Sequence, residues 1–344
     1  MGSSPENQPD DLPGSRLRDQ AGRVFLFTLL ALFLNGYSFG SADHAIHLIF
    51  VEELIQPGRY ADMLVAQALP HHPTIVWWIE ATLAKTVGLH QALLALHILA
   101  LAGTALATER LVRALGGGGQ AANLALLLMA PAHFALAGVD SLDPLFLPRG
   151  AALPFELLAL ALLLEGRLRS SFGLLGLAAC IHAPSAAALT IAALTSVLAD
   201  RGSDRRAPLM LVPGLLVATV IWLRGLLGRP WEASSILVDE AWYSIIDARL
   251  SAHLNPSSWA VTEWVQGLGQ LLLLLLFIFS PALVESRRRL LYLIGGMVTW
   301  AALGGSGLGA GARLALALQL EPWEGLRFVP WMLGAATAVF IAKT

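Results

Sequence analysis

Residues 171–199 read SFGLLGLAACIHAPSAAALTIAALTSVLA, an apolar run interrupted in its middle by His182-Ala183-Pro184. This run is well above the ~20 residues with which one helix crosses ~30 Å of hydrocarbon. Proline has no backbone N–H and disfavours helix in the residue before it. The sequence therefore predicts two short helices, 171–182 and 184–199, that meet in a hairpin and return the chain to the side from which it came.

The remainder of the chain is equally apolar. Of the 344 residues, 56% are hydrophobic and 13% are charged, with a mean hydropathy of +0.66. A soluble domain has about 45–50% apolar and about 25% charged residues, so the composition predicts an integral membrane protein. The net charge of −2 gives no basic surface for nucleic acid, and the single cysteine, Cys180, excludes an internal disulfide framework.

Further apolar runs complete the predicted bundle. They are 22–39, 89–114, 120–138, 151–165, 208–227, 265–284, 290–308 and 327–342. With the broken pair, they predict an all-α, polytopic bundle of about ten transmembrane helices. Residues 21–344 would form one transmembrane domain, and residues 1–20 a disordered cytoplasmic tail. The predicted external loops lie near 40–88, 139–150, 228–264 and 309–326.

Positive charge sets the predicted orientation. In this arrangement fourteen of the 22 Lys and Arg residues share a side with the N-terminus, and such residues are enriched in cytoplasmic loops. Both termini are therefore expected in the cytoplasm of a multi-pass cell-membrane protein, with the acids largely outside. A cleavable signal peptide ending near Gly40-Ser41-Ala42 is the alternative for the first span, although its polar leader would be long.

The segment after the first span is rich in polar side chains. If 43–55 is an interfacial helix, Asp43 and His47 lie one turn apart on one face, and Ile46 and Phe50 can lie against the membrane. The alternative is an acid that only caps its own helix. Further on, His71-His72 sits between prolines and precedes a Trp-bearing helix, 75–87, predicted to lie along the outer surface. The paired histidines could bind a metal or phosphate, or form a rigid polar turn.

This arrangement resembles the opening of GT-C-type membrane glycosyltransferases. The likeness rests on an acid after the first span, a helix followed by Gly58-Arg59-Tyr60, and His72-Pro73-Thr74 leading into a helix. It covers roughly residues 22–115, and the break at His182 resembles the paired short helices found further on in that superfamily. The resemblance implies sugar transfer from a polyprenyl-phosphate donor on the extracytoplasmic face, with Asp43 as the base that activates the acceptor. Since the chain ends directly after its last span, it also implies a short or truncated member.

A lipid phosphate needs cations and hydrogen-bond donors close to the membrane surface. The candidate substrate-binding residues share a predicted outer position: His44, His47, Arg59, His71, His72, Arg149, Arg249, His253, Arg313 and Arg327. Each arginine could equally be a snorkelling interface residue. Asp43 and His47 are also candidate ligands of a divalent metal, although no spacing fixes a ligand set.

Two other functions fit the sequence. One is a non-catalytic integral membrane subunit of a larger complex. The other is a transporter, which would place ionisable groups in a discontinuous helix near the bilayer midplane. The break within 171–199 contains no acid of its own, which counts against transport. The expected partners are the lipid bilayer, a polyprenyl-phosphate-linked sugar and membrane proteins of a complex, with no nucleic acid.

Overall fold

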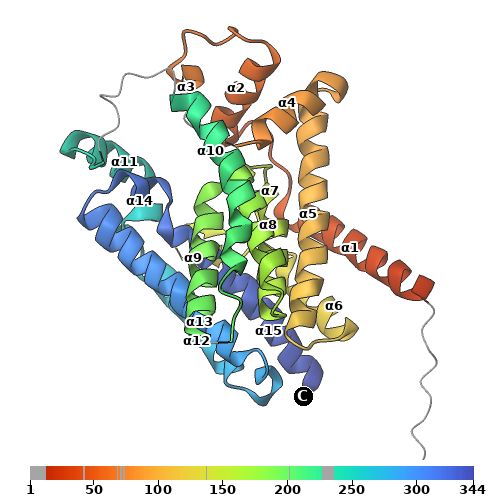
Figure 1. Ribbon diagram of the computed structural model, residues 1–344. Coiled ribbons are helices and arrows are strands. Elements are labelled where there is room, and N and C mark those ends of the chain that lie inside the picture. Colours follow the sequence, from red (N-terminus) through yellow and green to blue (C-terminus); the bar gives the residue numbers. More distant parts are fainter. Residues whose placement is uncertain are drawn as a thin grey trace, which may run out of the picture.

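The computed structural model describes residues 13–344, apart from Ala42, Ala68, Pro70, His71, Pro73, Ala137, Arg201 and residues 227–235. The described chain is almost wholly helical (Figure 1). One short antiparallel pair, β1 (Phe134–Ala135) with β2 (Val139–Asp140), interrupts the helices.

The helices follow one another along the whole chain. In order they are α1 (Pro13–Asn35), α2 (Asp43–Ile55), α3 (Leu64–Gln67), α4 (Val76–Val87), α5 (Leu89–Ala114), α6 (Gly119–Met129), α7 (Pro148–Leu164), α8 (Leu168–Ile181), α9 (Ala183–Ala199), η2 (Ala207–Leu211), α10 (Val212–Leu226), α11 (Glu240–Leu254), η4 (Pro256–Ser258), α12 (Val261–Ile278), η5 (Pro281–Leu283), α13 (Arg287–Thr299), the π-helical η6 (Trp300–Gly311), α14 (Ala315–Gln319), η7 (Pro322–Arg327) and α15 (Phe328–Lys343). The predicted helices 43–55 and 75–87 are confirmed as α2 and α4.

Four helical stretches among the described residues are long and apolar enough to cross a membrane. They are Leu89–Ala114, Val261–Ile278, Arg287–Gly311 and Ala315–Lys343. Except in Ala315–Lys343, much of their apolar surface is uncovered, and on α12 the exposed side chains include Val265, Leu268, Leu272 and Leu276. A soluble monomer rarely exposes an apolar face of this length, so hydrocarbon is the environment that suits it.

The predicted break at His182 is confirmed. α8 ends at Ile181, α9 begins at Ala183, and His182 between them is extended, with φ −147° and ψ 98°. Near the start of α8, the Arg169 guanidinium lies 2.8 Å from the carboxylate of Asp204, which follows α9. The two helices therefore run back on each other as a hairpin.

The break exposes two backbone carbonyls that other residues satisfy. Pro184 has no N–H to donate to the carbonyl of Cys180, which instead accepts from Ile75 N at 3.1 Å. The neighbouring carbonyl of Ile181 accepts from Thr74 Oγ1 at 2.6 Å. Since buried backbone groups are nearly always paired, the segment that begins α4 is attached to the hairpin at this point.

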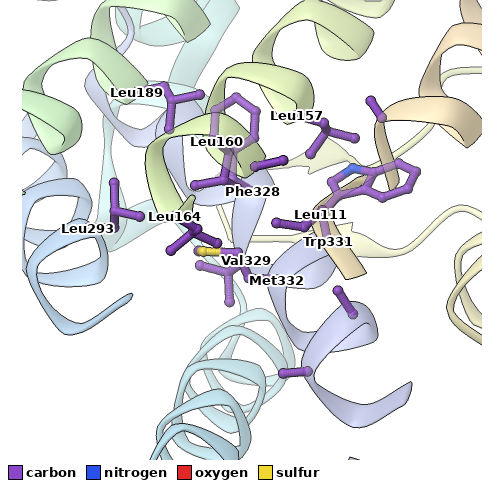
Figure 2. Close-up of a cluster of buried hydrophobic side chains, with 14 of the residues drawn as sticks. Leu111, Leu157, Leu160, Leu164, Leu189, Leu293, Phe328, Val329, Trp331 and Met332 are labelled. Carbon is purple, nitrogen blue, oxygen red and sulfur yellow. The ribbon is translucent and has the colours of Figure 1, made fainter. Parts of the chain in front are cut away.

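The last helix forms the centre of the bundle. Phe328, Trp331 and Met332 of α15 are fully buried, and Figure 2 shows them surrounded by leucines of α5, α7, α9 and α13. These leucines are Leu111, Leu157, Leu160, Leu164, Leu189 and Leu293. A helix that is apolar all round is expected inside a protein or a membrane, and α15 is largely inside the protein.

The predicted span 120–138 is wrong in its second half. α6 ends at Met129, and Pro131 has no N–H with which to continue the helix. The Asn35 side chain pairs with the emerging backbone instead, donating to the Ala130 carbonyl at 2.8 Å and accepting from Ala132 N at 2.7 Å. The chain then runs as a buried irregular segment up to Pro148.

The predicted tail also needs a correction. Residues 13–20, expected to be disordered, belong to α1. Pro13 is well placed in a first turn, and the Gln20 side chain donates to the buried Glu109 carboxylate at 3.2 Å. Residues 1–12 of the predicted tail lie outside the described residues.

The connecting segments gather at two ends of the bundle (Figure 1). We name the basic end for four contacts. Ser286, Arg288 and Arg289, at the start of α13, contact Ala114 at the end of α5, Asp200 after α9 and Leu164 at the end of α7, and Lys343 at the end of α15 contacts Ala282 of η5. We name the site end for the contacts Ser38–Pro144, Thr74–Ile181 and Arg149–Arg327.

We expect Gly214→Ala to destabilise the bundle. A Cβ at Gly214 of α10 would lie 2.2 Å from the backbone oxygen of Gly176 in α8, and backbone cannot move aside as a flexible side chain can. Overpacking of this kind costs about 1–3 kcal/mol. Thermal unfolding in detergent, followed by circular dichroism, measures the loss. Gly173→Ala on α8 is the control, because nothing lies within 4 Å of its new Cβ; equal unfolding temperatures for both variants would contradict the close crossing.

Candidate functional site

A buried ion pair organises the site end. Arg149, in the first turn of α7, donates from Nε and Nη2 to the Asp143 carboxylate at 3.0 and 2.6 Å. Burial raises the pKa of Asp143, but the Arg149 guanidinium outweighs that effect and holds the pKa below its ordinary value. Two parallel bonds of this kind fix orientation as well as distance, so the irregular segment before α7 is anchored to its first turn.

A second arginine lies behind the first. The Arg327 side chain, where η7 meets α15, is fully buried. Its Nη1 donates to the Arg149 carbonyl at 3.4 Å and lies 3.8 Å from the Glu324 carboxylate. Its Nε and Nη2 have no hydrogen-bond partner among the described residues. Buried donors of a charged group without hydrogen bonds are costly, so this position favours an anion or ordered water beside Nε and Nη2.

A small cavity adjoins Arg327. Its volume is about 20 Å³, and its polar lining residues are His97, Thr104, Ser141, Asp143 and Arg327. That volume accommodates about one water molecule, and the lining offers the polar partners that a buried water needs. The irregular segment before α7 thus contributes to a polar interior, the one setting in which non-helical backbone is tolerated at membrane depth.

The helix break is joined to buried acids of other helices. Ser185 Oγ donates to Glu156 Oε1 of α7 at 2.5 Å, and His182 Nδ1 lies 2.8 Å from the same hydroxyl. His182 Nδ1 is also 3.8 Å from Glu324 Oε2. One carboxylate oxygen each of Glu156 and Glu324 has no partner among the described side chains. Two carboxylate oxygens beside the break are therefore available to accept hydrogen bonds.

Asp43 lies at the rim of this cluster. Gly40, with φ +75°, makes the left-handed turn between α1 and α2 that glycine adopts without strain. Ser38 N donates to the Pro144 carbonyl at 2.7 Å, which holds this turn beside the Asp143 loop. Asp43 then begins α2 as an exposed residue. Burial lowers the pKa of Arg149, but the Asp143 carboxylate, with smaller contributions from Glu324 and Asp43, raises it above its ordinary value. An accessible acid is therefore within electrostatic range of the Arg149 guanidinium.

Glu321 completes the acidic side of the site. It interacts electrostatically with Asp43, Arg149 and Glu324, and its backbone is left-handed, with φ 41° and ψ 63°. A non-glycine residue in this region is strained, and such strain is found preferentially at functional sites. The turn at Glu321 directs η7 into the bundle, so that Glu324 and Arg327 are buried.

The histidines of α2 pack against aromatic rings. The centroid of His47 is 4.7 Å from Trp77. Burial, assisted by the nearby histidines His72 and His44 and by Arg149, lowers the pKa of His47 to about 3. Gly40 N donates to the Nδ1 atom of the buried His44 at 3.2 Å. His47 is therefore a neutral imidazole in the folded protein.

The predicted metal ligands can be placed. Asp43 and His47 share α2, as predicted, and a neutral imidazole is the form that binds metal. Within the described residues, however, no group of three or more His, Cys, Asp or Glu side chains is arranged to hold a metal ion.

Other predicted site residues lie away from the cluster. Arg59 pairs with Glu52 at 3.3 Å at the far end of α2. Arg313 pairs with Glu240 and lies 4.8 Å from the ring centroid of Tyr243, which joins η6 to α11.

The last four predicted residues are placed less fully. His253 ends α11, and Arg249 is in the same helix, where its side chain is outside the described part. His72 lies against Phe50, with 5.2 Å between ring centroids, and His71 is outside the described residues.

Several residues of the cluster were not predicted. Glu156, Ser185 and Glu324 join the site through contacts between helices, and no local spacing reveals such contacts. Glu156 did carry a readable signal, since an acid within an apolar span is a functional candidate by default.

Comparison of this chain with protein-family models, curated proteins and solved structures found no match.

We expect the α2–α4 region to become less stable as the pH is lowered. The folded-state pKa of His47 is about 3, below its ordinary value of 6.5, so the unfolded chain binds a proton more readily. The stabilisation is present above about pH 6.5 and is lost as pH falls toward about 3, by up to about 2 kcal/mol near pH 5. Unfolding temperature should therefore drop from about pH 7 to about pH 5, and less so in His47→Gln. The exposed His90 gives the control His90→Gln; if both variants keep the full drop, His47 is not its source.

Proposed function

We propose that this chain is a GT-C-like membrane glycosyltransferase. It transfers a sugar from a polyprenyl-phosphate donor to an acceptor on the extracytoplasmic face of the cell membrane. One observation carries the proposal: the buried Arg327, in contact with the Arg149 carbonyl, has two unpartnered guanidinium nitrogens, and the accessible carboxylate of Asp43 is within electrostatic range of the Arg149 guanidinium. The chemistry of such a transfer needs a base and an anion-binding site next to each other.

The membrane placement follows the two ends of the bundle. The four long apolar stretches and the shorter apolar helices α6, α8, α9 and α10 are eight membrane segments. With α1 and α7, which contain most of the apolar runs 22–39 and 151–165, they make up the proposed bundle of about ten. The basic end carries most of the arginines and lies in the cytoplasm with both termini, as the positive-inside rule favours. The site end then faces outward, with α2 and α4 at the outer interface and exposed Trp78 near the headgroups.

Each group in the cluster has a role in the proposed transfer. In the proposed transfer, the small cavity beside Arg327 opens to admit the donor phosphate between Arg149 and the free donors of Arg327, and the sugar hydroxyls bond to Glu156 and Glu324. Asp43 takes the proton from the acceptor hydroxyl as its oxygen bonds to the anomeric carbon. The bond from that carbon to the phosphate oxygen breaks, and the leaving polyprenyl phosphate is stabilised by the two guanidinium groups.

We expect Asp43→Asn to reduce sugar transfer by about 10²–10⁴-fold, the usual contribution of a general base. The assay uses purified protein in lipid nanodiscs with radiolabelled polyprenyl-phosphate sugars and measures release of polyprenyl phosphate. Asp62→Asn, at an exposed acid beyond α2, is the control. A variant Asp43→Asn with full transfer would remove Asp43 as the base. No transfer by the wild type with any donor, together with a co-purifying membrane partner, would favour the non-catalytic subunit.

Donor binding tests the arginines separately from the chemistry. Arg327→Lys keeps the charge but loses the planar fork of donors, so binding of a polyprenyl phosphate should weaken about tenfold or more, whereas Asp43→Asn should bind it normally. Arg313→Lys is the matched control, because Arg313 lies outside the cluster. Equal binding by both arginine variants would contradict an anion site at Arg327.

An ion-coupled transporter is the second candidate. The break contains no acid of its own, but Glu156 and Glu324 reach it from α7 and η7, which supplies the buried ionisable groups that transport through discontinuous helices uses. Glu156→Gln separates the two functions: in proteoliposomes a transporter should lose proton-driven uptake, whereas the transferase should keep the base Asp43 and part of its transfer activity.

A further inference from the structure

The basic end contains a pocket that the proposed transferase does not use. It lies between α1, α5 and α7, with a volume of about 390 Å³, and it is lined by Gln20, Leu106, Arg110, Arg113, Leu158, Leu162 and Arg167. Three arginines and three leucines thus line one hollow. Its α7 residues, Leu158 and Leu162, lie about 14 and 20 Å along the helix from Arg149, at 1.5 Å per residue, so the pocket is separate from the site end.

The pocket has more cations than its acids can neutralise. Glu109 accepts from Arg23 at 2.7 Å and from Arg113 at 3.0 Å, and Glu165 accepts from Arg110 at 2.6 Å. Arg167 is exposed and makes no ion pair with any described residue. Four guanidinium groups therefore face two carboxylates, which leaves a positive surplus at the pocket.

The apolar part of the pocket continues along α5. Leu99, Leu106, Arg110 and Arg113 follow one another at steps of seven, four and three residues, which places them on one face of the helix. Leu99 and Leu106 are 65% and 46% exposed, so much of their apolar surface is left uncovered by the described chain. The face offers an apolar track of about 17 Å that ends in two arginines.

We propose that this pocket binds an anionic phospholipid of the cytoplasmic leaflet. Its phosphate lies among Arg110, Arg113 and Arg167, and one acyl chain follows Leu106 and Leu99. Basic pockets between transmembrane helices on the cytoplasmic side suit such headgroups. A soluble anion would use the arginines alone, whereas a phospholipid uses both the charge surplus and the exposed leucines. The proposal rests on the membrane crossing and is independent of the chemistry at the site end.

Lipid titration by native mass spectrometry tests this site on the full chain released from detergent micelles. Phosphatidylglycerol should bind the wild type more tightly than phosphatidylcholine. The double variant Arg113→Gln/Arg167→Gln should weaken phosphatidylglycerol binding about thirty-fold, because each arginine near an anionic lipid contributes about a factor of five. Arg205→Gln/Arg206→Gln is the matched control, since these exposed arginines lie at the same end but outside the pocket, and it should change binding less than threefold.

Two further variants keep the test decisive. If loss of Arg113 disturbs its ion pair with Glu109 and the double variant misfolds, Arg167→Gln alone should still weaken binding about fivefold. Leu106→Gln should weaken phosphatidylglycerol and leave inorganic phosphate unaffected. Three results would each overturn the proposal. The first is equal weakening by the pocket and control variants, and the second is equal binding of phosphatidylcholine and phosphatidylglycerol. The third is that inorganic phosphate binds as phosphatidylglycerol does and that Leu106→Gln leaves the binding unchanged.

Discussion

The arrangement of the site depends on two backbone carbonyls at the break between α8 and α9. Pro184 cannot donate to Cys180, and the extended His182 leaves Ile181 without a helical partner. In an apolar interior each unpaired carbonyl costs several kcal/mol. Ile75 N and Thr74 Oγ1 remove that cost, and in doing so they fix the start of α4, with α2 packed on it, against the hairpin. The same break turns His182 and Ser185 toward acids of α7 and η7, so one missing hydrogen bond organises both halves of the site.

The charges gathered there are not explained by stability. Replacing a buried ion pair with packed apolar residues is often neutral or stabilising, and the surrounding core of α15 shows that this chain packs leucine and aromatic side chains well. Instead the cluster keeps Arg327 fully buried with unpartnered donors and keeps free carboxylate oxygens on Glu156 and Glu324. Donors and acceptors left open beside each other fit a ligand that offers both, as a sugar phosphate does.

The sequence was most informative where structure is local. α5 has its predicted bounds, 89–114, and α2 has its predicted bounds, 43–55, because their ends are marked by glycine, proline and charge. The run 120–138 could not be resolved in the same way, since a buried irregular segment is as apolar as a helix. In the site, Arg327 contacts the Arg149 carbonyl, and Asp43 is within electrostatic range of Arg149. Arg59 lies away from the site and pairs with Glu52. Because Glu52 is only seven residues earlier, the sequence could have indicated this local ion pair. Glu156 and Glu324 depend on contacts between helices, which a single sequence does not reveal.

The charges associated with α7 show how a bilayer constrains such a site. Arg149 lies in its first turn and Glu165 directly follows its last residue, where each can pair near an end of the bundle. Glu156, between them, is fully buried and bonds to Ser185 of the hairpin. A charge at mid-helix must face protein rather than lipid, and the hairpin supplies that protein surface. The acid and the broken helix therefore depend on each other: without the break Glu156 would lack its hydroxyl partner, and without Glu156 the hydroxyl at the break would face only apolar neighbours and His182.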